Sequence, residues 1–261
     1  MLLPHFLYIV TGANKGFGKV IAETIARQSK VKTSIVLVGR DLSQLESIEL
    51  KQENVSCYCI GNACLESAVE AEKTVIDQVE NLLRNWQEQD KAPVTNAILV
   101  NNAGSTGDLA KKVGDYNAAE IQEYVNLNIT SYISVVTGFI RLFKKSIVEM
   151  KIVNISSLLA VKAFPNWALY ATGKSARDML LKVVAVEEPS IRTLSYAPGP
   201  LDNQMQQHVR ETLADPEQNE LYSKMANEGN LVKMEDSALK LYELLEKNEF
   251  ESGSHVDFYD I

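Results

Sequence analysis

A tyrosine and a lysine stand four residues apart, at Tyr170 and Lys174, in a stretch whose pattern predicts a helix. On a helix, positions i and i+4 lie on the same face, with Cβ atoms about 5–6 Å apart. A lysine ammonium placed there favours the charged phenolate and lowers the pKa of the phenol, which suits a proton donor. Ser157 lies thirteen residues before the tyrosine. The alternative is a solvated helix face and a turn, because Tyr-x-x-x-Lys occurs by chance in many helices. A cofactor site elsewhere in the chain would decide between the two.

The elements that would position these residues alternate between short apolar runs and longer helical patterns. We expect strands at 6–10, 34–39, 55–60, 96–104, 150–157, 191–200 and 254–260, and helices at 19–28, 42–51, 65–89, 117–144, 167–187 and 235–247. Near-continuous apolar strands separated by helices indicate a parallel sheet that is covered on both faces. The predicted fold class is therefore α/β, a single doubly wound Rossmann-type domain over residues 1–261 with helices on both faces of a parallel sheet.

The least regular stretch is 201–230, which is polar and charged and follows Pro198-Gly199-Pro200. We predict a loop there. It would either close over a ligand on the substrate side, at the carboxyl ends of the strands, or form a plain surface connection.

Charge and composition limit the partners. The 261 residues carry a formal net charge of −8 with a pI of about 5.1, whereas nucleic acids and anionic membranes favour clustered basic residues. We expect neither as a partner. The amino terminus is apolar but lacks the basic region and cleavage site of a signal peptide, and its apolar run is too short to span a bilayer. A cytoplasmic protein is the expectation.

The three cysteines lie close together, at Cys57, Cys59 and Cys64. A metal site would need a fourth ligand at suitable spacing, and the chain has three histidines, all distant from this run. Cys57 and Cys59 alternate along a predicted strand. We therefore expect ordinary thiols on one strand face and no metal.

A glycine-rich segment, "TGANKGFG" at 11–18, follows the first predicted strand and opens the first helix. Gly12 permits a tight turn, Gly16 lets the backbone approach a pyrophosphate, and Gly18 allows close helix packing, with the phosphates at the helix amino terminus. The strand–turn–helix context is the one that dinucleotide binding requires. The residues of this segment expected at the cofactor are Gly12, Ala13, Asn14, Lys15, Gly16, Phe17 and Gly18.

The second predicted strand ends in "VLVGRD", where cofactor choice is usually decided. An acidic residue there holds the ribose 2′-hydroxyl of NAD, and an arginine accommodates the 2′-phosphate of NADP. Here Arg40 precedes Asp41, and Lys15 adds a second cation from the glycine segment. Two cations that converge on one phosphate favour NADP(H). The alternative for both is solvated surface charge.

The order and spacing of these motifs resemble the short-chain dehydrogenase/reductase family over essentially the whole chain. The resemblance rests on "TGANKGFG", "NNAG" at 101–104, Asn128 in "NLNIT", Ser157, the Tyr170/Lys174 pair and "PGP" at 198–200. The stretches "NNAGSTGD", "WALYATGKSARDML", "YAPGPLD" and "SGSHVDFYD" are similar, more narrowly, to members of the family that reduce the side-chain carbonyl of a pterin.

The resemblance implies a role for each catalytic candidate. Tyr170 would donate its phenolic proton to the developing alkoxide, and Ser157 would hydrogen-bond the substrate carbonyl. Lys174 would also hold the nicotinamide ribose. Asn128 would bend its helix around a water that links the lysine to solvent. The activity implied is NADPH-dependent reduction of a pterin carbonyl, a step toward tetrahydrobiopterin.

The resemblance also implies the remaining contacts with the cofactor and the substrate. Asp257 would hold the 2-amino-pyrimidinone edge of the pterin, because an ionised carboxylate accepts two adjacent N–H groups. Ala63 and Cys64 stand where the family normally has an aspartate that meets the adenine, which leaves backbone contacts at that place. The other residues expected to line the cofactor are Asn102, Ala103, Gly104, Pro198, Gly199, Leu201, Asp202, Asn203, Gln204, Met205 and Gln206.

Two alternatives to a pterin reductase stay open on the sequence. One is a general carbonyl reductase for small dicarbonyls, and the other is a catalytically idle dinucleotide-binding regulator. Family members commonly pair through two long helices, which the runs 117–144 and 167–187 would supply. A homodimer is therefore expected.

Overall fold

A parallel sheet forms the centre of the molecule. The computed structural model describes residues 3–89, 92–146 and 148–261, so residues 1–2, 90–91 and 147 of the predicted 1–261 domain lie outside the described part. Within it, seven strands pair in the order β3-β2-β1-β4-β5-β6-β7, and every neighbouring pair is parallel. The strands are β1 His5–Thr11, β2 Lys32–Val38, β3 Val55–Ile60, β4 Asn96–Asn101, β5 Glu149–Ile155, β6 Ile191–Ala197 and β7 Ser254–Asp257.

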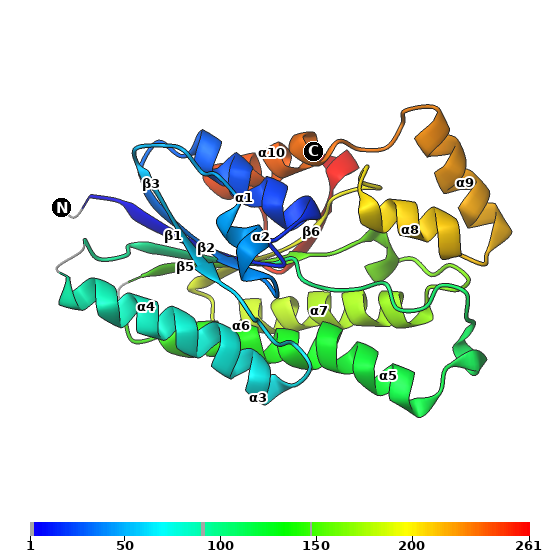
Figure 1. Ribbon diagram of the computed structural model, residues 1–261, viewed down its shortest axis with the longest axis horizontal. Helices are drawn as coiled ribbons and strands as arrows, with labels where there is room; N and C mark the ends of the chain where they lie inside the picture. Colours follow the sequence, from blue (N-terminus) through cyan, green and yellow to red (C-terminus); the bar gives the residue numbers. More distant parts are fainter. Residues whose placement is uncertain (1–2, 90–91, 147) are drawn as a thin grey trace.

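Helices cover both faces of the sheet, as the sequence predicted (Figure 1). One face carries α1 Gly16–Gln28, α2 Leu42–Glu46 and α10 Met234–Lys247, and the other carries three longer helical runs. Those runs are α3 Ala68–Ala71 with η1 Glu72–Ile76 and α4 Asp77–Glu88, then α5 Ala118–Val125 with η3 Asn126–Thr130 and α6 Ser131–Phe143, and finally α7 Ala168–Glu187. The doubly wound α/β prediction is confirmed.

The apolar core lies in two layers, one on each side of the sheet. Strand side chains alternate between them: Tyr8 and Val10 face the α1/α10 layer, whereas Leu7 and Ile9 face the α4/α6/α7 layer. Successive side chains of a strand point to opposite faces, and a sheet buried on both sides therefore needs continuous apolar runs. Among the described residues, no helix is long and apolar enough to cross a membrane.

The strand order reverses at β1. The chain runs outward through β2 and β3 on one side of β1 and then returns to place β4 on the other side. In doubly wound sheets, ligands bind outside the carboxyl ends of the strands at this reversal. The glycine segment after β1 and the "NNAG" segment after β4 meet here. The fold therefore brings together the two motifs that the sequence assigned to the cofactor.

The structure corrects four of the predicted elements. The helix predicted at 42–51 ends at Glu46. The helices predicted at 65–89 and 117–144 each contain a turn with π-type hydrogen bonding, η1 and η3. The loop predicted at 201–230 is wrong: the segment forms α8 Gln204–Thr212 and α9 Pro216–Asn227, which stand together at one end of the molecule (Figure 1).

Capping explains why this polar segment is helical. The side chain of Asn203 accepts a hydrogen bond from the backbone of Gln206 at 2.9 Å, and Asp215 accepts one from Gln218 at 3.1 Å. Asparagine and aspartate are favoured N-caps because they satisfy backbone N–H groups that the helix leaves unpaired. Pro216 occupies the first turn of α9, where its missing N–H costs nothing.

Candidate active site

The glycine segment adopts the backbone that its sequence requires. Gly12 and Gly16 have φ values of +65° and +57°, in the left-handed region that glycine enters without strain. A Cβ at Gly18 would lie 2.5 Å from the Asn102 side chain and from the carbonyl of Gly12. Helix α1 therefore packs directly on the turn, and its amino terminus faces the space beyond the sheet.

The "NNAG" segment is bonded to the glycine turn. Asn102 donates its side-chain N–H groups to the carbonyls of Thr11 and Gly12, at 3.1 and 3.2 Å. The Thr11 hydroxyl accepts from the backbone of Asn102 and Ala103, at 3.0 and 3.1 Å. Asn102 and Thr11 thus hold the glycine turn and the "NNAG" segment together, and we call these two segments the cofactor cradle. The role of Thr11 was not predicted, because a threonine that ends a strand gives no separate signal.

A cavity of about 2040 Å³ opens at the carboxyl ends of the strands. Small-molecule sites usually measure about 300–1,000 Å³, so this one has room for a dinucleotide beside a substrate. Most of the predicted site residues line it, whereas Ala13, Gly18, Asp41, Asn128 and Asp202 do not. The predicted residues that line the cavity are Gly12, Asn14, Lys15, Gly16, Phe17, Arg40, Ala63, Cys64, Asn102, Ala103, Gly104, Ser157, Tyr170, Lys174, Pro198, Gly199, Leu201, Asn203, Gln204, Met205, Gln206 and Asp257.

Two exposed cations stand at one end of this cavity. Lys15 and Arg40 both line it, and the Lys15 ammonium donates to the Gln204 side chain at 3.4 Å. Asp41 is turned away: its carboxylate accepts from the backbone of Gln44 at 3.2 Å and from the Ser43 hydroxyl at 2.7 Å, as the N-cap of α2. These hydrogen bonds lower the pKa of Asp41. The Asp41 carboxylate therefore caps α2 and does not face a ligand bound beside Lys15 and Arg40.

Ala63 and Cys64, which are expected near the adenine, line the cavity, and their backbone N–H groups have partners within the protein. The N–H of Ala63 donates to Gly39 at 3.1 Å, and that of Cys64 donates to the Thr74 hydroxyl at 2.9 Å. These two N–H groups are therefore not free for the adenine ring. Contacts of the ring with other backbone atoms here stay a prediction. Leu65 also lines the cavity here. The sequence analysis did not assign Leu65 to the site, because an apolar residue after a strand usually belongs to the core.

The catalytic candidates converge on one wall of the cavity. Tyr170 and Lys174 lie one turn apart on α7, as predicted, and Ser157 caps the short turn η4 Leu158–Ala160 by accepting from Leu159 at 3.2 Å. The Ser157 hydroxyl lies beside the Tyr170 phenol. The Lys174 ammonium lies 5.4 Å from the centre of the Tyr170 ring and donates to the carbonyl of Ile155 at 2.5 Å.

Burial dominates the protonation of both side chains. It raises the pKa of Tyr170 to about 12, although the neighbouring Ser157 and the charge of Arg177 act in the opposite direction. Burial and the charge of Arg177 lower the pKa of Lys174 to about 7. The expected effect of Lys174 on the pKa of Tyr170 stays a prediction. The positive charge that acts on both side chains is that of Arg177.

Asn128 lies in the π turn η3, where the resemblance implied a bent helix. Its side chain accepts from the backbone of Ser105 at 2.9 Å and donates to the carbonyl of Tyr124 at 3.0 Å. Its own carbonyl accepts from the Nε of Arg177 at 2.6 Å. The asparagine is thus a buried bridge between helix and loop. The water that the resemblance placed beside it stays a prediction.

The predicted final strand is confirmed, and it brings Asp257 to the cavity. Strand β7 pairs in parallel with β6 and ends at Asp257, whose carboxylate accepts from the backbone of Tyr259 at 3.0 Å. Two residues earlier, His255 also lines the cavity, and its Nδ1 lies 2.7 Å from the carboxylate of Asp178. Burial alone would raise the pKa of Asp178, but the hydrogen bond with His255 lowers it overall.

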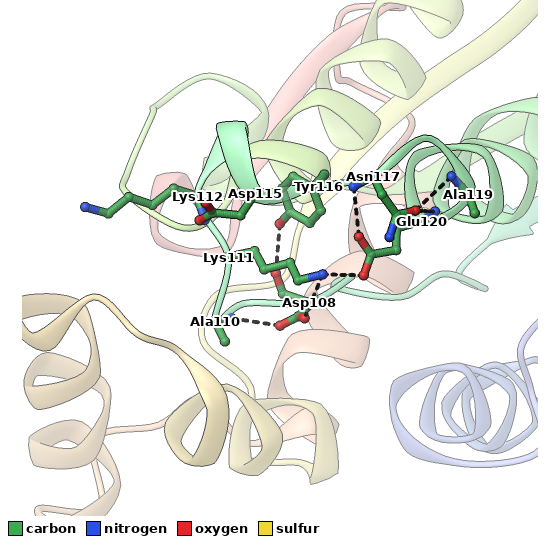
Figure 2. Close-up of polar contacts among 9 residues, drawn as sticks. All are labelled: Asp108, Ala110, Lys111, Lys112, Asp115, Tyr116, Asn117, Ala119 and Glu120. Carbon is green, nitrogen blue, oxygen red and sulfur yellow. Dashed lines mark hydrogen bonds and ion pairs between the residues drawn. The ribbon is translucent and has the colours of Figure 1, made fainter.

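A network of polar contacts holds the cavity wall between β4 and α5 (Figure 2). Lys111 pairs with Glu120 and, at 3.9 Å, with Asp108. The Tyr116 hydroxyl donates to the carbonyl of Asp108 at 2.8 Å, and Asn117 caps α5. Leu109, within this segment, packs in an apolar cluster with Leu159, Trp167, Val209 and Leu213. The wall is thereby joined to α8 across the cavity.

Comparison with known proteins agrees with this geometry. A family model described as short chain dehydrogenase matches residues 7–214. The chain belongs to this family. Sepiapterin reductase of Rattus norvegicus is 41% identical over 255 residues, which cover 97% of this chain and 96% of that protein. Benzil reductase ((S)-benzoin forming) of Bacillus cereus is 27% identical over 261 residues, 95% of this chain and 97% of the relative.

The fold of this short-chain dehydrogenase also occurs in solved structures. The crystal structure of the KRED1-Pglu enzyme has a TM-score of 0.81 at 21% identity, covering 96% of this chain and 99% of that one. This likeness establishes the fold alone. Together, the family model and the sepiapterin reductase relatives identify the chain as an oxidoreductase of the short-chain dehydrogenase family, similar to sepiapterin reductase.

Proposed function

We propose that the enzyme reduces the side-chain carbonyl of a pterin with NADPH, in the final part of tetrahydrobiopterin synthesis. The observation that carries the proposal is the position of Asp257. Its carboxylate lines the same cavity as Tyr170 and Ser157. A polar anchor and a proton donor in one cavity suit a substrate with a hydrogen-bonding ring at one end and a carbonyl at the other. The similarity to sepiapterin reductase supports the same substrate class.

The glycine cradle fits a dinucleotide, since a Cβ added at Gly16 would meet no atom within 4 Å. A pyrophosphate can therefore approach this backbone closely. Lys15 and Arg40 would hold the 2′-phosphate that distinguishes NADPH, and Asp41 is engaged at its own helix end. The cofactor, when bound, supplies the hydride, and the protein supplies orientation and the proton.

Tyr170 would donate the proton to the substrate. Its phenol keeps its proton at neutral pH, because burial raises its pKa to about 12. Ser157, beside it in the same cavity, would bind the carbonyl oxygen and hold it within reach of the phenol. As the alkoxide develops, the proton passes from the tyrosine oxygen to the substrate oxygen. This is general acid catalysis, in which geometry is the first requirement and pKa the second.

An aromatic wall suits a flat substrate. The ring centre of Trp167 lies 5.3 Å from that of Tyr170 and 6.4 Å from that of Tyr222, and Phe164 packs against the same cluster. All four side chains line the cavity. Aromatic faces stack favourably on planar rings. A pterin anchored by Asp257 would lie along this wall with its side chain toward Tyr170.

The test compares sepiapterin with a small diketone in one NADPH-oxidation assay. Asp257→Asn keeps an oxygen that can cap the Tyr259 turn but removes the charge that a pair of N–H donors needs. We expect this variant to raise KM and lower kcat for sepiapterin, while the diketone is reduced at nearly the parent rate. Equal losses on both substrates would make Asp257 a structural residue and remove the main support for a pterin.

A second candidate function is general reduction of dicarbonyls. The relationship to benzil reductases favours it, since benzil is a diketone. In that case the diketone would be the better substrate of the parent enzyme, and Asp257→Asn would change neither rate. If neither substrate supports NADPH oxidation, the protein would be the catalytically idle dinucleotide-binding regulator.

We also propose that the enzyme is a homodimer. Apolar side chains are exposed on two neighbouring helices, with Ile133 on α6 and Met179, Val183 and Val186 on α7. A patch of this kind is often an interface. Light scattering after size-exclusion chromatography should give about twice the chain mass of 29.0 kDa, and a mass equal to one chain would overturn the dimer.

A further inference from the structure

Arg177 is a buried cation behind the active site. The side chain is 3% exposed and lies on α7, three residues after Lys174. Its Nε donates to the carbonyl of Asn128 at 2.6 Å, and its Nη2 donates to the carbonyl of Ala103 at 2.9 Å. The guanidinium also lies 4.7 Å from the ring of Tyr132. One side chain therefore joins α7, the π turn η3 and the "NNAG" segment.

The remaining nitrogen of this guanidinium points to a function beyond structure. Nη1 is buried and has no hydrogen-bond partner among the described residues. It lies beneath the cofactor cradle, since a Cβ at Gly104 would be 3.6 Å from it. Burying a charge is costly unless it is fully paired, and an unsatisfied buried donor calls for an explanation. Hydrogen bonds to two carbonyls could be made by a neutral side chain without that cost.

The groups around Arg177 are those that would respond to its charge. Tyr124 faces it from α5 and Tyr132 from α6, and α7 itself contributes Tyr170, Lys174 and Asp178. The Asp178 carboxylate hydrogen-bonds Asn154 at 2.9 Å and contacts His255 at 2.7 Å. The positive charge of an arginine is permanent in proteins, because its proton is not lost. Its field therefore acts on the two catalytic side chains at every working pH.

We propose that Arg177 is a positioning residue that acts through Tyr170 and Lys174, by holding a fixed positive charge behind them. The proposal rests on the proton-donor role of Tyr170 given above. When the phenolic O–H bond breaks and the proton moves to the substrate alkoxide, the negative charge that remains on the phenolate is offset by the guanidinium. Burial raises the pKa of Tyr170 and lowers that of Lys174, and the charge of Arg177 lowers both.

The first test is a titration without cofactor or substrate. The side-chain nitrogen of Lys174 is followed by NMR in protein labelled at lysine, with Lys174→Met to assign the signal. Arg177→Gln keeps hydrogen-bond donors but removes the charge. We expect its Lys174 titration to move from about pH 7 to higher pH by about one unit or more, the usual effect of one adjacent charge. An unchanged titration would overturn the proposal.

Arg192 offers a matched control. It also donates to two backbone carbonyls, those of Asn248 and Phe250, lies 4.8 Å from an aromatic ring, and has one buried nitrogen without a partner among the described residues. It lies on β6 and does not line the cavity. Arg192→Gln should leave the Lys174 titration where it is in the parent. A shift as large as that of Arg177→Gln would show that both act through general loosening.

The second test is the pH profile of kcat. Without the charge, Tyr170 becomes a weaker acid. Arg177→Gln should lower kcat with a larger solvent isotope effect and move the alkaline limb to higher pH. Arg177→Leu should move the limb equally, because both variants lack the charge. A lower kcat with an unmoved limb would mean a structural role only. Should sepiapterin prove not to be a substrate, the titration still decides on Arg177, and so the two proposals fail separately.

Discussion

Replacing Lys174 by methionine should stabilise the folded protein while it abolishes catalysis. The lysine is 9% exposed, and its ammonium donates to the carbonyl of Ile155 at 2.5 Å. Burial, with the charge of Arg177, lowers the pKa of Lys174 from 10.5 to about 7. The folded protein therefore disfavours the charged form that the unfolded chain holds at neutral pH. Methionine has a similar length and no titratable group.

The size of the effect follows from linkage. One pKa unit corresponds to about 1.4 kcal/mol, so the lowered pKa reduces the free energy of unfolding by about 4 kcal/mol at pH 7 and about 2 kcal/mol at pH 9. Between about pH 7 and pH 10.5 the unfolded chain binds the proton and the folded protein does not, so stability rises with pH in this window. Below pH 7 both states bind it, and this contribution is constant. Losing the hydrogen bond costs about 1 kcal/mol, which leaves a net gain of about 2–3 kcal/mol at pH 7.

Urea unfolding of the unliganded parent and variant at several pH values from 6 to 9 measures this. The difference in unfolding free energy should favour Lys174→Met at pH 6 and shrink by about 2–3 kcal/mol by pH 9. Lys151 is the control: it also donates to a carbonyl, that of Leu245 at 2.7 Å, but it is only half-buried, and burial lowers its pKa. Lys151→Met should show a smaller change in the same direction. A destabilised Lys174→Met with the pH slope of the parent would refute the reasoning.

Two further predictions concern catalysis and cofactor choice. Tyr170→Phe should lower kcat by about 10²–10⁴-fold, the usual contribution of a general acid, with NADPH binding nearly unchanged in a fluorescence titration; activity within a factor of about three of the parent would contradict a proton-donor role. Arg40→Leu should weaken NADPH binding and hardly alter NADH binding, and the preference of the parent for NADPH should shrink in high salt. Equal losses for both cofactors would show that Arg40 does not contact the 2′-phosphate.

Much of the fold could be predicted because its signals are local. The apolar runs that became β1 and β4 are continuous, as strands covered on both faces must be. The glycine spacing at 12, 16 and 18 follows from backbone geometry, which the structure reproduces at all three positions. The Tyr170/Lys174 pair depends only on helix periodicity. Each of these features involves residues that lie within one or two turns of each other.

The missed features depend on partners far away in sequence. Arg177 bonds to carbonyls 49 and 74 residues distant, and His255 meets Asp178 across 77 residues. A charged residue on a helix predicts a solvated face unless such a partner is known. The π turn at Asn128 has no local signal either. Helices α8 and α9 did carry capping residues, but their few buried side chains left no apolar period to recognise.

Helix α7 shows why these failures gather at the site. Its later turns bury Leu181 and Val184 in the apolar layer, as a helix packed on a sheet should. Its earlier turns instead bury Lys174, Arg177 and Asp178. Such a face is unfavourable for folding alone, since each of these groups loses water, and it survives because the two apolar layers of the sheet outweigh it. A run of buried charge on an otherwise ordinary helix is the kind of local conflict that folded proteins keep mainly at functional sites. The same conflict explains why removing Lys174 should make the protein more stable and less able to act.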